Sequence, residues 1–507
     1  MKKWALILIP VMLILFAFVV IGCSNSEEAD TTPAVPGEVG ETHEIPREAD
    51  VTPNVPIQPP PVGTTEPPDD YSDPTPDMPR DYIVICGEQI STAERALRIF
   101  VSDEEWVGRV ETVLHVCITN VTADADIAQL RYMTNLQTLS IDFTHENSPG
   151  IRSRISDISA LAGLTSLTNL RLLGHSISDI SALAGLTSLT TLELSRNSIC
   201  DISALAGLTN LTKLDLEYNE INDISALAGL TNLSSLDLSR NRISEISGLA
   251  ELRNLTILRF YDVDNEISDA GDFIDVLSKL VSLNVLTIGN HQISDISALS
   301  ELVNLTELRI WNSQVSDISA LTGLTGLTKL DIRGSEIGDV SALAGLDNLT
   351  ELWIGNSPLS DLTPLSGFTN LTDLNLGYNQ ISDLTPLSGL EDLTRLDLGS
   401  NQISDLLPLA GLANLRSLNL ESNQISNLLP LSGLTNLTYL SLYSNQISDL
   451  TPLSGLTNLR NLGLGFNQIS DLSSLSGLTN LYFLGLYDNQ INDWSPVAHV
   501  ENVSGRP

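Results

Sequence analysis

The chain has 507 residues and a formal net charge of −38 at pH 7, with 63 acidic and 25 basic residues. A charge of this sign argues against binding to nucleic acid and against docking on an anionic lipid surface. Four cysteines in a chain of this length do not make a disulfide framework, although Cys86 and Cys117 could pair with each other.

The N-terminus has the charged start and the apolar run of a secretion signal. Lys2 and Lys3 come first, and the apolar run ends at Val20-Ile21-Gly22-Cys23. The last four residues resemble the lipobox of bacterial lipoproteins, which implies a signal peptide at 1–22, cleavage before Cys23 and a lipid on that cysteine. The alternative is an uncleaved transmembrane anchor. In both cases the lysines stay inside, so we expect an extracytoplasmic protein held at the bacterial cell membrane.

Residues 23–80 differ in composition from the rest of the chain. They are rich in proline and acidic residues and have almost no apolar side chains, so they cannot bury a core. We expect a disordered, partly extended stalk that holds the remaining chain away from the membrane, although a linker without that role fits the composition as well.

Residues 81–113 are interpreted as an N-terminal cap, because the first coil of a solenoid needs its apolar end covered. Within this segment, residues 82–86 have the composition of a strand. Ser91 and Glu94 have the spacing of a capping box, which predicts a short helix after them.

From residue 114 to residue 496 the sequence repeats with a period of 22 residues. The stretch 435–456, TNLTYLSLYSNQISDLTPLSGL, shows the unit: a short strand pattern at Leu440-Ser441-Leu442, then Asn445 and a series of spaced apolar residues. One coil cannot bury these side chains alone, but stacked coils can. We therefore predict one elongated domain with seventeen parallel strands, from 114–116 to 484–486, closed by a short C-terminal tail at 497–507.

An asparagine at the turn that follows the strand recurs through most of the array. A buried carboxamide at this place must bond to the backbone of adjacent coils, so its repetition predicts an asparagine ladder. The predicted members are Asn197, Asn219, Asn241, Asn379, Asn401, Asn423, Asn445, Asn467 and Asn489. In other coils Ser153, His175, His291, Ser313, Ser335 and Ser357 hold the position, or the ladder shifts by one residue to Asn290, Asn312 and Asn356.

An acidic residue also recurs once in nearly every coil, usually two residues before Ser or Thr. It suits the N-cap of a short helical turn on the outer face, with a calcium-binding stripe as the alternative. The positions are Asp157, Asp179, Asp201, Asp223, Asp295, Asp317, Asp339, Asp361, Asp383, Asp405, Asp449, Asp471 and Asp493.

Two coils are longer than the others. Residues 145–152 lengthen one, and residues 261–283 lengthen another, with Phe273, Val276 and Leu280 at helical spacing. The second insertion contains an acidic group, Asp262, Asp264, Asn265 and Glu266, that is either a solvated loop or a calcium site. Insertions in solenoids often lie on the binding face.

The repeat resembles the leucine-rich repeat family, and the segment 445–453, NQISDLTPL, is similar to the bacterial repeats of internalins. The resemblance implies an α/β solenoid: a horseshoe with a parallel inner sheet and short helical or 3-10 turns on its convex face. It also implies a scaffold for recognition, whose partner the fold does not identify.

Residues next to the strand leucines point to the concave face, since side chains alternate across a strand. Large exposed aromatic residues there predict a binding surface. We place its centre at Tyr439, Tyr443, Phe466, Phe483 and Tyr487, with Tyr378, Trp353 and Trp311 extending it towards the middle of the array. A second candidate is an acidic column of Glu193, Asp215 and Asp237, countered by Arg196, Lys213 and Arg240 or by a basic partner.

The sequence contains no catalytic constellation, phosphate-binding loop or metal-ligand spacing, so we expect neither an enzyme nor a cofactor. The favoured function is protein recognition by an adhesin-like or receptor-like surface protein. The alternatives are a module that binds a cell-surface glycan through aromatic platforms and a stalked structural protein without a specific ligand.

Overall fold

The computed structural model describes residues 82–85, 115–119, 127–142, 155–261, 265, 270–289 and 293–506. All described residues belong to one compact unit, Pro79–Pro507. The signal peptide, Cys23, the stalk, the helix after Ser91 and the side chains of Cys86 and Cys117 lie outside the described part. None of the described helices is long and apolar enough to cross a membrane.

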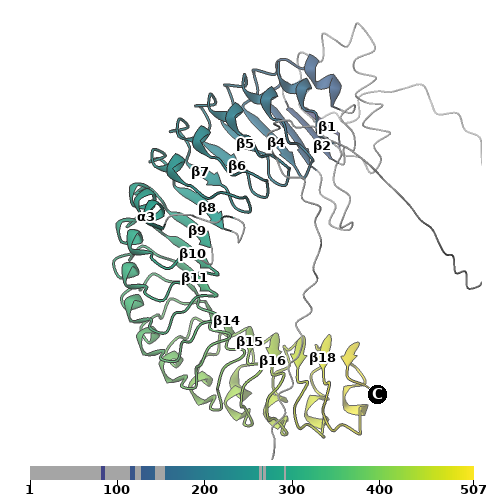
Figure 1. Cartoon of the computed structure of the whole chain (residues 1–507). Coiled ribbons are helices and arrows are strands. Elements are labelled where there is room, and N and C mark those ends of the chain that lie inside the picture. The colour runs from purple at the N-terminus through teal and green to yellow at the C-terminus, as the bar shows by residue number, and fades with distance from the viewer. Residues whose placement is uncertain are drawn as a thin grey trace, which may run out of the picture. The chain divides into compact units, whose positions relative to one another are not determined.

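In the described part of the chain, 19 strands form one parallel sheet, and each strand pairs with the next along the sequence (Figure 1). The strands are β1 (Tyr82–Ile85), β2 (His115–Thr119), β3 (Thr138–Asp142), β4 (Asn169–Leu173), β5 (Thr191–Glu193), β6 (Lys213–Asp215), β7 (Ser235–Asp237), β8 (Ile257–Tyr261), β9 (Val285–Gly289), β10 (Glu307–Trp311), β11 (Lys329–Arg333), β12 (Glu351–Trp353), β13 (Asp373–Asn375), β14 (Arg395–Asp397), β15 (Ser417–Asn419), β16 (Tyr439–Ser441), β17 (Asn461–Gly463), β18 (Phe483–Gly485) and β19 (Asn502–Ser504). The predicted seventeen repeat strands correspond to β2 through β18, so the predicted solenoid is confirmed.

The sheet continues past the repeats at both ends. β1 is the predicted strand of the segment before the array, and it pairs with β2. β19 was not predicted, because the residues after the last coil are polar or small and have no strand pattern. It pairs with β18, and the Leu486 amide donates to the Ser504 carbonyl at 3.0 Å.

Short 3-10 helices line the side of the array opposite the sheet (Figure 1). They are η2 (Ala128–Tyr132), η3 (Ser159–Leu161), η4 (Ser181–Leu183), η5 (Ser203–Leu205), η6 (Ser225–Leu227), η7 (Ser247–Leu249), η8 (Ser297–Glu301), η9 (Ser319–Leu321), η10 (Ser341–Leu343), η11 (Thr363–Leu365), η12 (Thr385–Leu387), η13 (Leu407–Leu409), η14 (Leu429–Gly433), η15 (Thr451–Leu453), η16 (Ser473–Leu475) and η17 (Ser495–Val497). The predicted outer layer of short helical turns is therefore confirmed.

In most of these turns the recurring aspartate stands one residue before the N-cap residue. In η3 the Asp157 carboxylate accepts the Ser159 amide at 2.8 Å, while Ile158 is the N-cap residue. The bond from that serine backbone lowers the pKa of Asp157, which is fully exposed. The same bond recurs throughout the array, and Asn427 makes it to Leu429 where aspartate is absent. The position is thus a structural cap, of the side-chain turn type.

The predicted helix in the second insertion is α3 (Ala270–Lys279), and its buried residues include Phe273, Val276 and Leu277. It packs against η7 and η8, on the convex side of the array (Figure 1). The helix of this insertion therefore thickens the outer layer of the array, whereas residues 262–264 and 266–269 lie outside the described part.

The core is one continuous apolar cluster that runs through the coils. In the coil of β16, Leu440 and Leu442 point inward from the strand, and Ile447, Leu450 and Leu453 follow them, all fully buried or nearly so. Because each coil places its leucines between those of its neighbours, no coil has a core of its own.

The asparagine ladder is confirmed at all nine predicted positions. Asn423 shows the pattern: its Nδ2 donates to the carbonyls of Leu398 at 3.0 Å and Leu420 at 3.2 Å, and its Oδ1 accepts the Ile403 amide at 3.0 Å. Leu398 and Ile403 belong to the preceding coil, so one side chain joins two coils. A buried carboxamide is expected to have its donors and its acceptor hydrogen-bonded in this way.

Other residues complete the ladder where the period breaks. His175 is fully buried and bonds through Nε2 to the Ile141 carbonyl at 2.9 Å. Ser313 bonds to Ser335 at 2.8 Å, whereas Asn312 is exposed, so the ladder is not shifted there. Asn265 is also a member: it is fully buried, and its Oδ1 accepts the Ile243 amide at 2.9 Å. Asn265 is therefore a ladder residue, while Asp262, Asp264 and Glu266 of the same acidic group lie outside the described residues.

Candidate binding face

The inner surface of the sheet is built from columns of residues that stand in register on successive strands. Tyr439 of β16 aligns with Asn461 and Phe483, and Ser441 aligns with Gly463 and Gly485. Each column repeats every 22 residues in most of the array, so the side chains of one column lie about 4.8 Å apart. The repeat sequence therefore determines which residues are neighbours on this face.

The five residues proposed as the centre of the site lie on three adjacent coils, and we call them the C-terminal aromatic patch. They are Tyr439, Tyr443, Phe466, Phe483 and Tyr487. Phe466 and Tyr487 are more than half exposed, at 54% and 52%. Tyr439 and Phe483 are exposed at the ends of the same column, with Asn461 between them. The structure thus brings the five onto one stretch of the inner face.

Tyr443 is only half-buried, yet it lies flat on its neighbours. A Cβ atom added to Gly463, Gly465 or Gly485 would collide with its ring. These three glycines, which we call the glycine floor, belong to the next two coils and have no side chain to stand beside the ring. Tyr443 is consequently held across the sheet, with one face on the floor and the other available.

Phe466 and Tyr378 occupy the position immediately before the ladder asparagine. The backbone there has positive φ, 58° at Phe466 and 59° at Tyr378, as it has in Ser400, Ser422 and Ser444 of the intervening coils. Tyr378 is 63% exposed, but serines separate it from Phe466 along this column. It is therefore a separate aromatic residue and not a continuation of the patch.

Trp311 and Trp353 are half-buried and engaged in contacts in the middle of the array. The Trp311 indole N–H donates to Asp331 at 2.8 Å, and that of Trp353 donates to Asp373 at 3.1 Å. The Arg333 guanidinium lies between the two rings, 5.5 Å from the centroid of Trp311 and 5.1 Å from that of Trp353. Arg333 also forms a bidentate pair with Asp331, so this cation is neutralised.

Tyr261 joins this central group, although the sequence analysis did not select it. Its ring meets that of Trp311 edge to face, with centroids 5.1 Å apart, across Gly289. Period-22 alignment of the strands would have shown Arg333 beside Trp311, because they stand in register. Tyr261 and Trp311 are further apart in sequence because α3 lengthens the coil between them, which hid their proximity.

The acidic column exists as predicted: Glu193, Asp215 and Asp237 stand in register on β5, β6 and β7. Glu193 pairs with Lys213, as expected, and with Arg171 of the preceding strand, which was not foreseen. The first member of the column is therefore neutralised within the protein.

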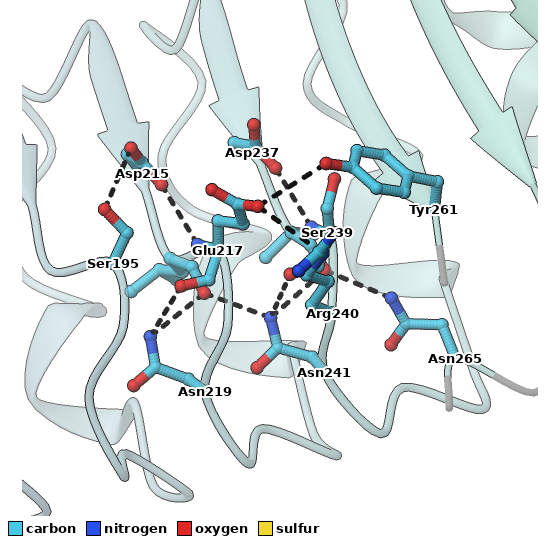
Figure 2. A network of polar contacts seen from close by, with 12 residues as sticks. Ser195, Asp215, Glu217, Asn219, Asp237, Ser239, Arg240, Asn241, Tyr261 and Asn265 are labelled. Atoms are coloured by element: carbon cyan, nitrogen blue, oxygen red, sulfur yellow. Dashed lines mark hydrogen bonds and ion pairs between the residues drawn. The ribbon is translucent and has the colours of Figure 1, made fainter. Parts of the chain in front are cut away.

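Asp215 and Asp237 belong to a polar network that includes a carboxylate missed in the sequence, Glu217 (Figure 2). Asp215 accepts the Glu217 amide at 3.0 Å, and Glu217 accepts the Tyr261 hydroxyl at 3.4 Å. Asp237 accepts the Ser239 amide at 3.0 Å. Burial, together with the charges of Asp215 and Glu217, raises the pKa of Asp237 to about 6.

The arginines expected to neutralise the column have other contacts. Arg240 approaches Glu217, at 3.7 Å, and lies over the rings of Tyr218 and Tyr261. Arg196 lies over Tyr218, 5.9 Å from its centroid. The two guanidiniums thus contact the aromatic side chains beside the column and not the carboxylates of the column.

Within the described residues, no group of three or more histidines, cysteines or carboxylates is arranged to hold a metal ion. Figure 2 shows the acidic network bonded to hydroxyls, amides and an arginine. The geometry of the inner face is that of a recognition surface: columns of varied side chains on a rigid sheet.

Comparison with known proteins agrees with this class. The leucine-rich repeat region family matches residues 150–399, and the leucine rich repeats (2 copies) family matches residues 413–455 and 457–499. These matches cover more than half of the chain, which belongs to the leucine-rich repeat proteins. No curated protein matches it significantly.

Three solved structures place the chain among similar proteins. Internalin InlF of Listeria monocytogenes is 28% identical, with 82% of this chain and 95% of that one covered and a TM-score of 0.39. Internalin C2 of the same organism is 38% identical, with 40% and 81% covered and a TM-score of 0.33. A leucine-rich repeat protein of Leptospira interrogans is 19% identical, with 82% and 99% covered and a TM-score of 0.53, and shares the fold.

Proposed function

We propose that this protein is a cell-surface recognition protein whose inner sheet binds a protein partner through the C-terminal aromatic patch. The observation that carries the proposal is the exposure of Phe466 and Tyr487 beside a Tyr443 ring held on the glycine floor. Aromatic side chains that are exposed and already ordered bind at low entropic cost, and they are enriched among the residues that dominate binding energy.

The size of the face supports a macromolecular partner. Nineteen strands give an inner sheet on the order of 90 Å along its length at about 4.8 Å per strand. A surface of this kind suits a folded partner with a convex outline better than a small molecule. Open grooves line parts of the described surface, which fits recognition over an extended area.

The test compares partner binding by the wild-type chain and by a variant with Tyr443→Ala and Phe466→Ser. Serine is the residue of Ser400, Ser422 and Ser444 at the Phe466 position, so the positive-φ backbone is kept. We expect a partner isolated with the wild-type chain to bind the variant at least tenfold more weakly, because each anchor contributes about 2 kcal/mol. The melting temperature should be nearly unchanged.

Tyr132→Ser provides the matched control, since Tyr132 is an exposed aromatic residue of η2, on the convex side. It should leave binding intact. Normal binding by the patch variant together with lost binding after changes at Glu193, Asp215 and Asp237 would move the site to the acidic column. If no partner is retained by the wild-type chain, the structural, stalked role replaces recognition.

We also propose that Cys23 carries a lipid that anchors the chain at the extracytoplasmic side of a bacterial membrane. The motif Val20-Ile21-Gly22-Cys23 after the apolar run supports this assignment. Cys23→Ala should abolish fatty-acid labelling and release the chain from the membrane fraction. If the wild type and the Cys23→Ala variant both stay in the membrane fraction and neither is labelled, the apolar segment is a transmembrane anchor instead.

A further inference from the structure

Between β4 and β18, one edge position of the inner sheet carries a cation or an aromatic ring only in the last coils. The residue two positions before the central strand leucine is Thr, Ser or Asn in eleven coils: Thr168, Thr190, Thr212, Ser234, Thr256, Asn284, Thr306, Thr328, Thr350, Thr372 and Thr394. Its hydroxyl commonly donates to the carbonyl of the preceding coil, as Thr394 does to Thr372 at 3.0 Å. In the last four coils this position holds Arg416, Thr438, Arg460 and Tyr482, so only Thr438 keeps the usual residue type.

These four residues are direct neighbours. The Thr438 amide donates to the Arg416 carbonyl at 2.9 Å, the Arg460 amide to the Thr438 carbonyl at 2.9 Å, and the Tyr482 amide to the Arg460 carbonyl at 2.8 Å. The two arginines are thus two coils apart, on the order of 10 Å. Three substitutions that give up a repeated side-chain bond are grouped at one place, which the fold does not require.

A groove of about 250 Å³ lies between the arginines, lined by Arg416, Thr438, Arg460 and three asparagines, Asn436, Asn458 and Asn480. Both arginines are exposed, and neither forms an ion pair with any described carboxylate. The segments that build this edge, 413–418, 435–440, 457–462 and 479–484, contain no acidic residue in a chain that has 63. Carboxylates flank these segments, with Glu391 and Asp392 in the coil before and Glu501 in the strand after, but neither arginine is ion-paired with them.

The groove also has neutral hydrogen-bonding groups and an aromatic border. Asn436 and Asn458 each donate to the preceding coil, at 2.9 and 2.8 Å, which fixes the carboxamides and leaves their oxygens as acceptors towards the groove. Tyr482 is 59% exposed at the end of the row, and Tyr439 and Phe483 follow Thr438 and Tyr482 in sequence. Cations, amides and aromatic rings therefore alternate along one edge.

We propose that this edge groove binds an anionic polysaccharide that carries sulfate or carboxylate groups. Guanidiniums two coils apart bind anionic groups on successive sugars, carboxamides bind hydroxyls, and Tyr482 stacks against a sugar face. An acidic peptide is less suited, because it offers few hydroxyls to the asparagines and needs no stacking surface. The site lies beside the concave face and does not depend on the protein partner proposed above.

The experiment measures binding of the full chain to dextran sulfate, to polygalacturonate and to neutral dextran, at low and at high salt. We expect binding to at least one of the two anionic polymers, weakened by salt, and none to neutral dextran. Dextran sulfate tests for binding of sulfate groups, and polygalacturonate tests for binding of carboxylate groups. Poly-glutamate is the acidic peptide probe.

The variant with Arg416→Thr and Arg460→Thr places at both positions the residue that most other coils use. It should keep or raise the melting temperature and weaken polysaccharide binding at least tenfold. The variant with Arg242→Thr and Arg253→Thr is the matched control, because it removes the same charge from two exposed arginines in earlier coils. It should bind as the wild type does.

Equal weakening by the two double variants would overturn the proposal, since net charge alone would then explain binding. Binding of poly-glutamate that equals or exceeds that of the polysaccharides would also overturn it in favour of an acidic peptide. Failure of the wild type to bind either anionic polymer would remove the site. None of these results bears on the C-terminal aromatic patch, whose variant retains both arginines.

Discussion

At the scale of single residues, stacking depends most on the ladder asparagine. Asn423 donates to three backbone carbonyls and accepts the Ile403 amide, and it is buried between coils. The sequence was sufficient to predict this role, since a polar side chain at a fixed place among leucines has to bond to the backbone. Asn265 was missed because two inserted residues displace it from the period.

Asn423→Ala should destabilise the array by about 1–3 kcal/mol, because it leaves the buried Ile403 amide without its partner and removes one of the two side-chain bonds to the Leu398 carbonyl. Urea unfolding followed by circular dichroism measures the difference. Asn436→Ala is the control: Asn436 is exposed and bonds only to the Ala413 carbonyl. An Asn423→Ala midpoint equal to that of the wild type would contradict the role of the ladder.

Asp237 should make stability depend on pH in the direction opposite to most carboxylates. Its folded pKa, near 6, lies above the unfolded value. Its contribution is therefore fully present below the unfolded pKa of about 3.9 and is lost as pH rises through 6. Asp237→Asn should match the wild type near pH 3.5 and exceed it by about 1–2 kcal/mol at pH 7.5.

Asparagine is already compatible with this column, because Asn375 and Asn419 accept the same backbone bond, at 3.0 and 3.1 Å. Thermal melts across pH 3.5–7.5 give the comparison. Asp179→Asn is the control, since the Ser181 backbone amide lowers the pKa of Asp179 and the substitution should not stabilise at neutral pH. A pH-independent gain at Asp237 would argue against the raised pKa.

At the scale of elements, the strands were predictable from the leucine spacing, whereas the contacts across strands were not. The glycine floor shows why. Gly463, Gly465 and Gly485 are visible in the sequence, but nothing there indicates that Tyr443 lies across two coils instead of pointing outward. That choice depends on a side-chain rotamer and on the absence of three neighbouring Cβ atoms.

Gly485→Ala should displace the Tyr443 ring, because the added Cβ collides with its hydroxyl end. We expect a loss of about 1 kcal/mol in the wild-type background and a smaller loss in a Tyr443→Ala background, where the space is empty. The double-mutant cycle should give a coupling energy of about 0.5–1 kcal/mol. Additive effects would show that the ring and the floor do not interact.

The contacts of Arg333 could not be predicted from a single column of residues either. Arg333 lies between Trp311 and Trp353, which come from two different columns. Sequence reasoning selected the tryptophans as binding residues because they are large and on the inner face. The structure gives them a second role, since both indole N–H groups already bond to aspartates.

At the scale of the whole molecule, the coils are not equally connected. From Asn379 to Asn489 every coil has a ladder asparagine, but Ser313, Ser335 and Ser357 hold the position in the middle of the array. A serine hydroxyl donates one hydrogen bond where a carboxamide donates two. Ser357, for example, donates to the Ser335 carbonyl at 2.9 Å. At the ladder position, the middle coils are therefore joined by fewer hydrogen bonds.

Hydrogen exchange should detect this difference. In a solenoid, stability is a sum of coil and interface contributions, so a region with weaker interfaces opens first. Backbone amides in residues 315–354 should exchange faster than those in residues 381–464 under native conditions, measured by mass spectrometry of proteolytic fragments. Uniform protection across both regions would show that the leucine core alone sets the local stability.

The direction of the ladder bonds has a consequence for synthesis. Asn423 accepts the Ile403 amide of the coil before it, so a finished coil presents one such unfilled backbone amide to the chain that leaves the ribosome next. At about 5–20 residues per second a new coil of this length emerges every few seconds and finds that template in place. Growth can proceed from the first coil to the last without waiting for distant sequence, and β19 then pairs with β18 although it carries no repeat.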